Sequence, residues 1–266
     1  MLRKTYRHYA MCGDSTSEDD VAKLMDGEKA DMVFTSPPYS DQRDYGGNLN
    51  LDPYHLAKAV FNFPAIFYAV NLGIQIKNRE IVTYWDEYLR YAKERDIKLL
   101  SWNIWDKGNA SAPAHQQAMF GLCHEWVFIF GEYKKQNLIK ENKGAQTWGQ
   151  PTVREKDGSL TKKSKVVTST HRQLDTVIDI PAVKNYSDEF TEHPAQFPIE
   201  LAEQYILSGT NKVDLVSDPF LGSGSTLIAC EKTNRKCYGM EIDVKYMNVI
   251  LKRFEEYSGD TVELVC

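Results

Sequence analysis

Residues 31–39 read Asp-Met-Val-Phe-Thr-Ser-Pro-Pro-Tyr, and this stretch decides where the reactive edge of the fold lies. The apolar run Met32–Phe34 has the character of a buried strand. Two prolines then end the run, because proline cannot donate a backbone N–H to a helix or to a central strand. Ser36 and the ring of Tyr39 are therefore expected at the carboxyl end of a strand, where open α/β sheets bind ligands.

The same stretch suits chemistry at the exocyclic amino group of a nucleobase. That nitrogen is a poor nucleophile, because its lone pair is conjugated into the ring. Hydrogen bonds from the amino group to Ser36 and to the carbonyl of Pro37 would make the nitrogen more tetrahedral, and Tyr39 would stack on the base. Pro37 and Pro38 keep the carbonyls from moving, so the site is preorganised. The alternative interpretation is a core strand that ends in prolines and an ordinary loop serine.

Composition excludes several classes of protein. The 266 residues are 42% hydrophobic and 26% charged, which is ordinary for a globular α/β domain, and the net charge of -5 favours no overall attraction to nucleic acid. The five cysteines form no C-x-x-C pair, so neither a disulfide framework nor a metal site is predicted. We expect a cytoplasmic protein, since the N-terminus does not resemble a signal peptide and no apolar run reaches the roughly 20 residues of a membrane span.

A second motif lies near the C-terminus. A predicted strand at 212–216 runs into Asp-Pro-Phe-Leu-Gly-Ser-Gly-Ser at 218–225, and a helix and a strand ending in Glu241 follow. The distance from Gly222 to Glu241 matches that of an acid that holds ribose hydroxyls. The turn is neither G-x-G-x-x-G nor a P-loop, which favours an uncharged adenosyl ligand with a short zwitterionic tail. Asp14, in a turn after a predicted strand at 5–12, would also meet the cofactor, or it is only a turn residue.

The remaining segments complete an α/β pattern. A helix is predicted at 84–95, with strands at 98–105 and 124–131. Residues 41–80 are interpreted as a lid or interface insertion, whose aromatic part at 54–78 could face a partner. From Lys134 to Arg172 there are ten Lys and Arg against three Asp and Glu, which suits a phosphate backbone, although a solvated loop has the same composition.

Together the two motifs resemble the beta group of S-adenosylmethionine-dependent DNA amino-methyltransferases, in which the Ser-Pro-Pro-Tyr motif precedes the glycine turn. His-Pro-Ala-Gln-Phe-Pro at 193–198 is also similar to the family, except that Phe197 replaces its usual lysine. The resemblance implies a Rossmann-like, doubly wound, mostly parallel sheet in circularly permuted order. Residues 1–130 would form the catalytic half, 131–190 a target-recognition insertion and 191–266 the cofactor-binding half.

The resemblance also implies roles for individual residues. The flipped base would be held by Ser36, Pro37, Pro38 and Tyr39. S-adenosyl-L-methionine would be held by Asp14, Ser36, His193, Asp218, Phe220, Gly222, Ser223, Gly224, Ser225 and Glu241. The basic segment contributes the predicted DNA-binding residues Lys134, Lys135, Lys140, Lys143, Arg154, Lys162, Lys163 and Arg172.

The sequence thus predicts a site-specific methyltransferase acting on double-stranded DNA. Cytosine N4 is the favoured target, because serine before Pro-Pro-Tyr goes mostly with cytosine in this family, and adenine N6 is the alternative. An RNA or protein amino-methyltransferase and a non-catalytic DNA-binding module are further alternatives. The resemblance leaves open a homodimer and a cognate restriction endonuclease as partners. It favours a bacterial, archaeal or phage origin.

Overall fold

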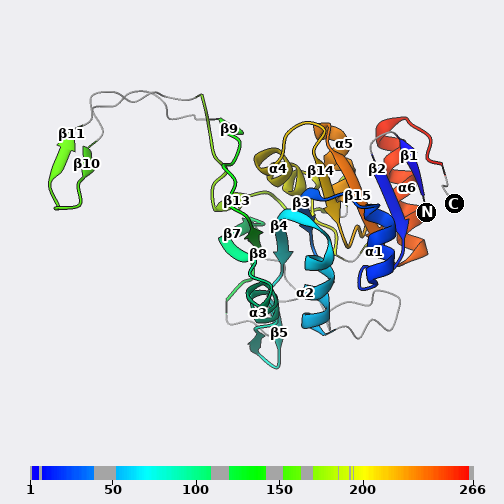
Figure 1. Ribbon diagram of the computed structural model, residues 1–266, viewed down its shortest axis with the longest axis horizontal. Coiled ribbons are helices and arrows are strands. Elements are labelled where there is room, and N and C mark those ends of the chain that lie inside the picture. The colour runs from blue at the N-terminus through cyan, green and yellow to red at the C-terminus, as the bar shows by residue number, and fades with distance from the viewer. Residues whose placement is uncertain are drawn as a thin grey trace.

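The computed structural model describes residues 2–5, 8–38, 52–108, 120–141, 152–162, 170–184, 186–191, 193 and 195–263. Within these residues, nine strands form one sheet (Figure 1). Their order across the sheet is β1 (Leu2–Thr5), β2 (His8–Cys12), β15 (Lys236–Glu241), β14 (Leu215–Asp218), β3 (Ala30–Thr35), β4 (Ala65–Leu72), β8 (His124–Gly131), β7 (Lys98–Asp106) and β13 (Val177–Asp179).

The expected α/β sheet with mostly parallel strands is confirmed. Strands β2, β15, β14, β3 and β4 run parallel to one another, and β13 runs parallel to β7. Of the nine strands of this sheet, only β1 and β8 run against their neighbours. We call the edge where β2, β3, β4, β14 and β15 end the carboxyl edge, and the opposite one the amino edge.

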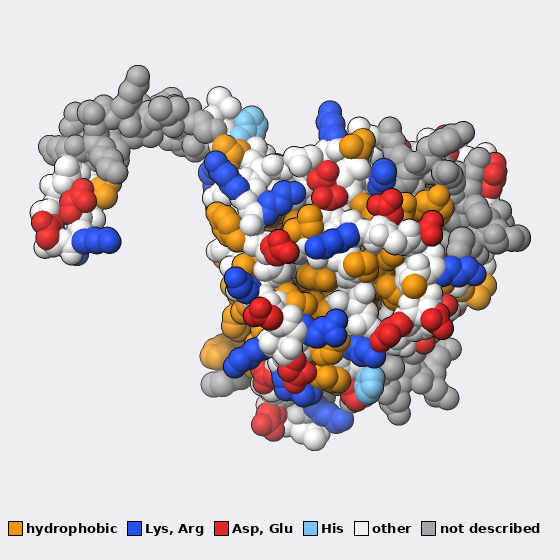
Figure 2. All heavy atoms as spheres, viewed as in Figure 1, with side chains coloured by type: hydrophobic (Ala, Val, Ile, Leu, Met, Phe, Trp, Pro, Cys, Tyr) orange, Lys and Arg blue, Asp and Glu red, His pale blue; other side chains and the backbone are white. Residues whose placement is uncertain are grey.

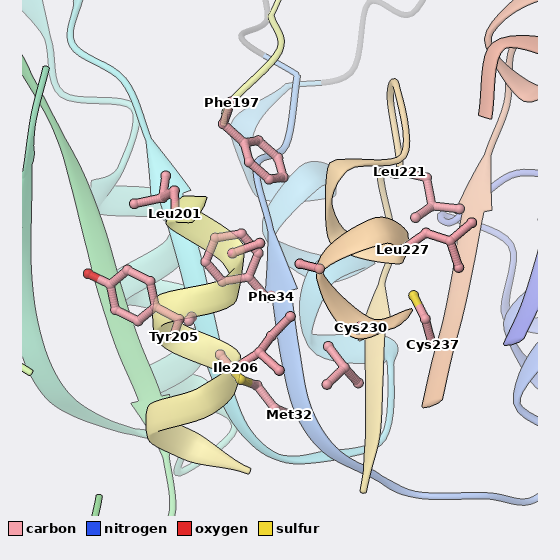
Figure 3. Packing of buried hydrophobic residues seen from close by; sticks show 14 of the residues in the cluster. Met32, Phe34, Phe197, Leu201, Tyr205, Ile206, Leu221, Leu227, Cys230 and Cys237 are labelled. Atoms are coloured by element: carbon pink, nitrogen blue, oxygen red, sulfur yellow. The ribbon is translucent and has the colours of Figure 1, made fainter. Parts of the chain in front are cut away.

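Two layers of helices cover the sheet. Helices α1 (Glu18–Met25), α2 (Pro53–Asn62) and α3 (Asp86–Glu94) pack on one face, and α4 (Ile199–Gly209), α5 (Ser225–Thr233) and α6 (Val244–Ser258) on the other. Strand β3 is buried on both faces, with Phe34 directed to α4 and Val33 to the opposite core. The ring of Phe34 lies 5.5 Å from that of Phe197 and 5.6 Å from that of Tyr205 (Figure 3). None of the described helices combines the length and hydropathy that a bilayer crossing requires.

Helix boundaries follow the local chemistry. Ser17 caps α1, since its hydroxyl accepts the N–H of Asp20. Pro198 is the N-cap of α4. Gly209 is the last residue of α4. Glycine is required there for space, because a Cβ would lie 2.2 Å from the ring of Phe67.

The interpretation of residues 41–80 as an insertion is wrong for the part that the structure describes. Residues 53–62 form α2, and 65–72 form β4, which lies between β3 and β8 in the middle of the sheet. The aromatic side chains Phe61, Phe63 and Phe67 are buried. The segment at 54–78 therefore supplies core rather than a partner-facing surface, and a strand buried on both faces shows no alternation that would reveal it.

An arm projects from the body between β8 and β13. We define it as the described residues 132–141, 152–162 and 170–176. It contains two two-stranded ladders, β9 (Lys140–Glu141) with β12 (His171–Arg172) and β10 (Thr152–Arg154) with β11 (Leu160–Lys162). Because β8 is antiparallel and β13 parallel to the rest, the arm leaves and re-enters the sheet at the amino edge (Figure 1). The last part of 131–190 includes β13 and so belongs to the sheet.

Candidate active site

A pocket opens at the carboxyl edge, between the ends of β2, β3, β14 and β15. Its lining includes most of the site residues predicted from the sequence, which are Asp14, Ser36, Pro38, His193, Phe220, Gly222, Ser223, Ser225 and Glu241. Pro37 is buried beside it, and Tyr39 lies outside the described residues. Two stretches that are about 180 residues apart in sequence thus meet because β3 and β14 are neighbours.

The cofactor motif folds as a tight turn between β14 and α5. Gly222 and Gly224 have φ of 56° and 86°, which glycine adopts without the Cβ penalty. A Cβ on Gly222 would lie 3.1 Å from the imidazole of His193, so glycine keeps this side of the pocket open. Arg253 holds the turn from outside, because its Nη1 donates to the carbonyl oxygen of Ser223 at 2.8 Å.

Glu241 ends β15 at the floor of the pocket. Its Oε2 accepts the N–H of Gly222 at 2.8 Å, and its Oε1 accepts the N–H of Asp243 at 3.0 Å. Burial raises the pKa of this carboxyl to about 7, against the opposing effect of the two backbone N–H donors. The carboxylate retains lone pairs that can accept hydrogen bonds from ligand hydroxyls.

Asp218 and Gly224 do not line the pocket, contrary to the expectation that they contact the cofactor. Asp218 is fully buried, where it accepts the hydroxyl of Thr226 at 2.6 Å and the N–H of Phe220 at 3.0 Å. Burial raises the pKa of Asp218 to about 6. Gly224 is the N-cap of α5 and packs against Ile250. Both residues shape the turn from behind.

Asp14 lines the pocket and is also a turn residue. Its Oδ1 accepts the N–H and the hydroxyl of Thr16, at 2.9 and 2.7 Å. Its own N–H donates to Asp20 at 2.9 Å. The neighbouring N–H of Gly13 donates to the carbonyl of Glu241 at 3.1 Å, which joins the β2 end to the cofactor strand.

Several lining residues were not predicted as site residues. Tyr246 packs edge-on against His193, with the ring centroids 4.5 Å apart. Phe197 lines the pocket with a nearly buried ring, and its carbonyl accepts the hydroxyl of Ser225 at 2.9 Å. Gln196 and Met240 also line the pocket. Gln196 and Phe197 belong to the stretch at 193–198 that is similar to the family, and the structure gives Phe197 an apolar packing role.

The lining chemistry suits an uncharged adenosyl group. Leu221, Met240 and Ile242 supply apolar surface for a flat base, and Glu241 supplies acceptors for hydroxyls. Among the described residues that line the pocket there is no Lys or Arg, which a row of phosphates would need. The residues present therefore fit a nucleoside that has no phosphates.

Comparison with known proteins places this geometry in a family. A family model described as DNA methylase, of the N6/N4 type, matches residues 30–252. The chain belongs to the N6/N4 DNA methylase family. Members of this family are DNA amino-methyltransferases that act on adenine N6 or cytosine N4, and they are S-adenosylmethionine-dependent.

Individual relatives agree with this assignment. The chain is 39% identical over 259 residues to the type II methyltransferase M.ScaI of Streptomyces caespitosus, covering 91% of this chain and 80% of M.ScaI. Its fold is similar to that of PvuII DNA methyltransferase (cytosine-N4-specific), with a TM-score of 0.65 at 19% identity, over 93% and 86% of the two chains. It is also similar to the M1.HpyAVI–SAM complex, with a TM-score of 0.60 at 19% identity, over 93% and 98%.

Those predicted DNA-binding residues of this N6/N4 methylase that the structure describes lie away from the pocket. Lys134 and Lys135 are at the amino edge, at the root of the arm, and Arg154 and Lys162 are on its outer ladder. Lys140 and Arg172 both pair with Asp175, and the bond from Arg172 lowers the pKa of that carboxyl to about 2. Lys143 and Lys163 lie outside the described residues. On the face in Figure 2, basic and acidic side chains alternate.

Proposed function

We propose that this chain transfers a methyl group from S-adenosyl-L-methionine to the N4 amino group of a cytosine flipped out of double-stranded DNA. The observation that carries the proposal is that Ser36, from the catalytic stretch, and Glu241, which holds the cofactor turn, line the same pocket. Transfer of a methyl group from an adenosyl cofactor to a base needs both ligands at one opening.

The cofactor half has a defined division of labour in this proposal. S-adenosylmethionine, when bound, supplies a methyl group on an electrophilic sulfonium. The Glu241 carboxylate accepts hydrogen bonds from the ribose hydroxyls. Phe220 and its apolar neighbours contact the adenine near Asp14. His193, fixed by Tyr246, lies beside the methionine part.

The catalytic half positions the amino group. Ser36 Oγ and the carbonyl oxygen of Pro37 accept the two amino N–H groups, so that the nitrogen lone pair points out of the plane of the base. Tyr39 stacks on the base and offsets part of the few kcal/mol that unstacking costs. Buried Pro37 keeps its carbonyl in place, so the acceptors need no reorganisation during the reaction.

The choice of cytosine rests on Ser36. A serine takes up a proton less readily than the carboxylate of an aspartate, and serine at this position goes mostly with cytosine N4 in the family. The similarity in fold to a methyltransferase described as cytosine-N4-specific is consistent with this choice. Adenine N6 is the alternative. Basic residues of the arm are proposed to add contacts to the phosphate backbone, and a homodimer and a partner endonuclease remain predictions.

Single-molecule sequencing of DNA from a methylation-free host that expresses this chain tests the proposal. A defined sequence motif that carries N4-methylcytosine is the expected result. The same motif with N6-methyladenine would keep the methyltransferase and overturn the assignment of the base. Unmodified DNA from a host that contains the folded protein would contradict the proposal, and labelled-methyl transfer to RNA or protein would then identify another acceptor.

A further inference from the structure

We propose that a hairpin at the carboxyl edge contacts the DNA beside the flipped base, with Arg79 as its DNA-binding side chain. The hairpin consists of β5 (Gln75–Lys77) and β6 (Glu80–Val82), joined by Asn78 and Arg79. The inference rests on the proposed function, because it assumes that DNA delivers a base to Ser36. It adds a DNA contact by a residue that lies outside both the sequence motifs and the basic arm.

The hairpin lies on the same edge as the catalytic stretch. Strand β4 pairs with β3 so that Val70 lies opposite Thr35, the residue before Ser36. The chain leaves β4 at Leu72 and enters the hairpin three residues later. In Figure 1 the hairpin is the lowest part of the ribbon, on the side toward which the arrowhead of β4 points. A duplex that presents a base to Ser36 approaches this edge, whereas the arm leaves from the opposite one.

The hairpin has a firm root and a defined tip. At the root, Gln75 is buried and the hydroxyl of Tyr84 donates to the carbonyl of Gly73 at 2.7 Å. Gln75 pairs with Val82 and Lys77 with Glu80, which leaves a two-residue loop at the tip. A two-stranded ribbon of this kind fits the major groove of B-DNA.

The tip residues have an unusual backbone conformation. Asn78 and Arg79 have φ of 54° and 65°, as a type I′ turn requires. Asparagine tolerates this region, and glycine is favoured at the second position, whereas an arginine there is conformationally unfavourable. We therefore infer that the arginine at position 79 serves through its side chain and not through its backbone conformation. Residues held in such conformations are concentrated at functional sites.

The charge of the tip points to an anionic partner. Lys77 lies opposite Glu80, whereas Arg79 is exposed and has no ion-pair partner among the described residues. A guanidinium binds phosphate oxygens and the O6 and N7 atoms of guanine in the same forked geometry. The exposed side chain of Ile81 would suit a contact between two copies of the chain, and the experiment therefore includes that outcome.

The test compares Arg79→Gly with the wild type and with Lys98→Ala, which removes one exposed positive charge at the amino edge. Duplex DNA that carries the methylated motif is titrated, and affinity for S-adenosylmethionine and thermal stability are measured alongside. We expect Arg79→Gly to weaken DNA binding by about tenfold or more, with an unchanged cofactor affinity and an unchanged or higher melting temperature. Lys98→Ala should bind DNA as the wild type does.

Unaltered DNA affinity of Arg79→Gly would overturn the inference if the wild type methylates DNA. A shift in oligomeric mass without a change in DNA affinity would assign the hairpin to a contact between copies and would overturn it as well. A wild type that neither binds nor methylates DNA would instead contradict the proposed function, and the inference would fall with it. If Arg79→Gly lowers the affinity equally for DNA of every sequence, Arg79 contacts a phosphate. If it lowers the affinity only for DNA with the methylated motif, Arg79 contacts a base.

Discussion

The cofactor turn and the arm are both polar segments between strands, yet they are held very differently. In the turn, Asp218 and Glu241 are withdrawn from solvent, and each accepts two hydrogen bonds from neighbouring groups. In the arm, Lys140 and Arg172 share Asp175 in solvent, and each ladder has only two strands. The turn is rigid because its polar groups have defined partners in a buried setting, where each lost bond is expensive. Isolated ladders of two strands are at best marginally stable.

The largest effect should come from the reacting end of the pocket. Ser36→Ala removes one of the two acceptors that shape the amino nitrogen, and we expect the rate of methyl transfer to fall by about 10²-fold or more, as for the loss of one preorganised group in other enzymes. Affinity for S-adenosylmethionine, measured by calorimetry, should stay within about twofold, because Glu241 and the glycine turn are intact. Loss of cofactor affinity in this variant would show that the division between the two halves is wrong.

The second effect is on stability. Asp218→Ala leaves the hydroxyl of Thr226 and the N–H of Phe220 without their acceptor in a buried place, and we expect the free energy of unfolding to fall by about 3 kcal/mol. Asp157→Ala is the matched control in the arm, where the carboxylate accepts the N–H and hydroxyl of Ser159 in solvent. It should cost less than about 0.5 kcal/mol. Equal losses in denaturant titrations would remove the contrast between turn and arm.

The third effect is a pH dependence of cofactor binding. The pKa of Glu241 is raised to about 7, and only the carboxylate has its full set of acceptors for ribose hydroxyls. Affinity for S-adenosylmethionine should therefore fall as the pH drops below 7, by up to about tenfold per unit, and Glu241→Gln should bind more weakly but without this dependence. A flat profile from pH 5 to 8 in the wild type would contradict the assigned role.

Stability should respond to pH in the opposite direction. Because the folded-state pKa of Glu241 lies above its ordinary value of 4.5, the native state holds the proton more tightly than the unfolded chain does. The contribution to stability is therefore fully present below pH 4.5, declines as the pH rises to about 7 and is constant above that. Denaturant unfolding of Glu241→Gln against the wild type isolates this contribution.

The smallest effect should come from the ladder of β9 and β12 in the arm. Lys140→Ala removes one of two cations from a solvent-exposed carboxylate, and exposed ion pairs contribute about 0–1 kcal/mol. We expect the melting temperature to stay within about 2 °C of that of the wild type. A large loss would mean that the arm is stabilised as a unit with the sheet.

The sequence by itself determined the family, the α/β class and most of the pocket, because the chemistry is concentrated in two short motifs. Pro37, Gly222 and Glu241 impose local backbone and hydrogen-bonding requirements that can be read without the fold. Tertiary structure alone decided that Asp218 lies behind the turn, since burial depends on which strands are neighbours. It also decided that β4 is a central strand.

Only the tertiary structure shows which edge of the sheet each surface segment leaves. The basic composition of the arm predicted DNA contact, but the antiparallel direction of β8 places the root of the arm at the amino edge, away from Ser36. The short run at 75–82 has only two basic residues against one acidic residue, yet β4 carries it to the carboxyl edge with Arg79 at its tip. The composition of a segment indicates what it can bind, whereas the direction of the adjoining strand decides at which edge of the sheet the segment lies.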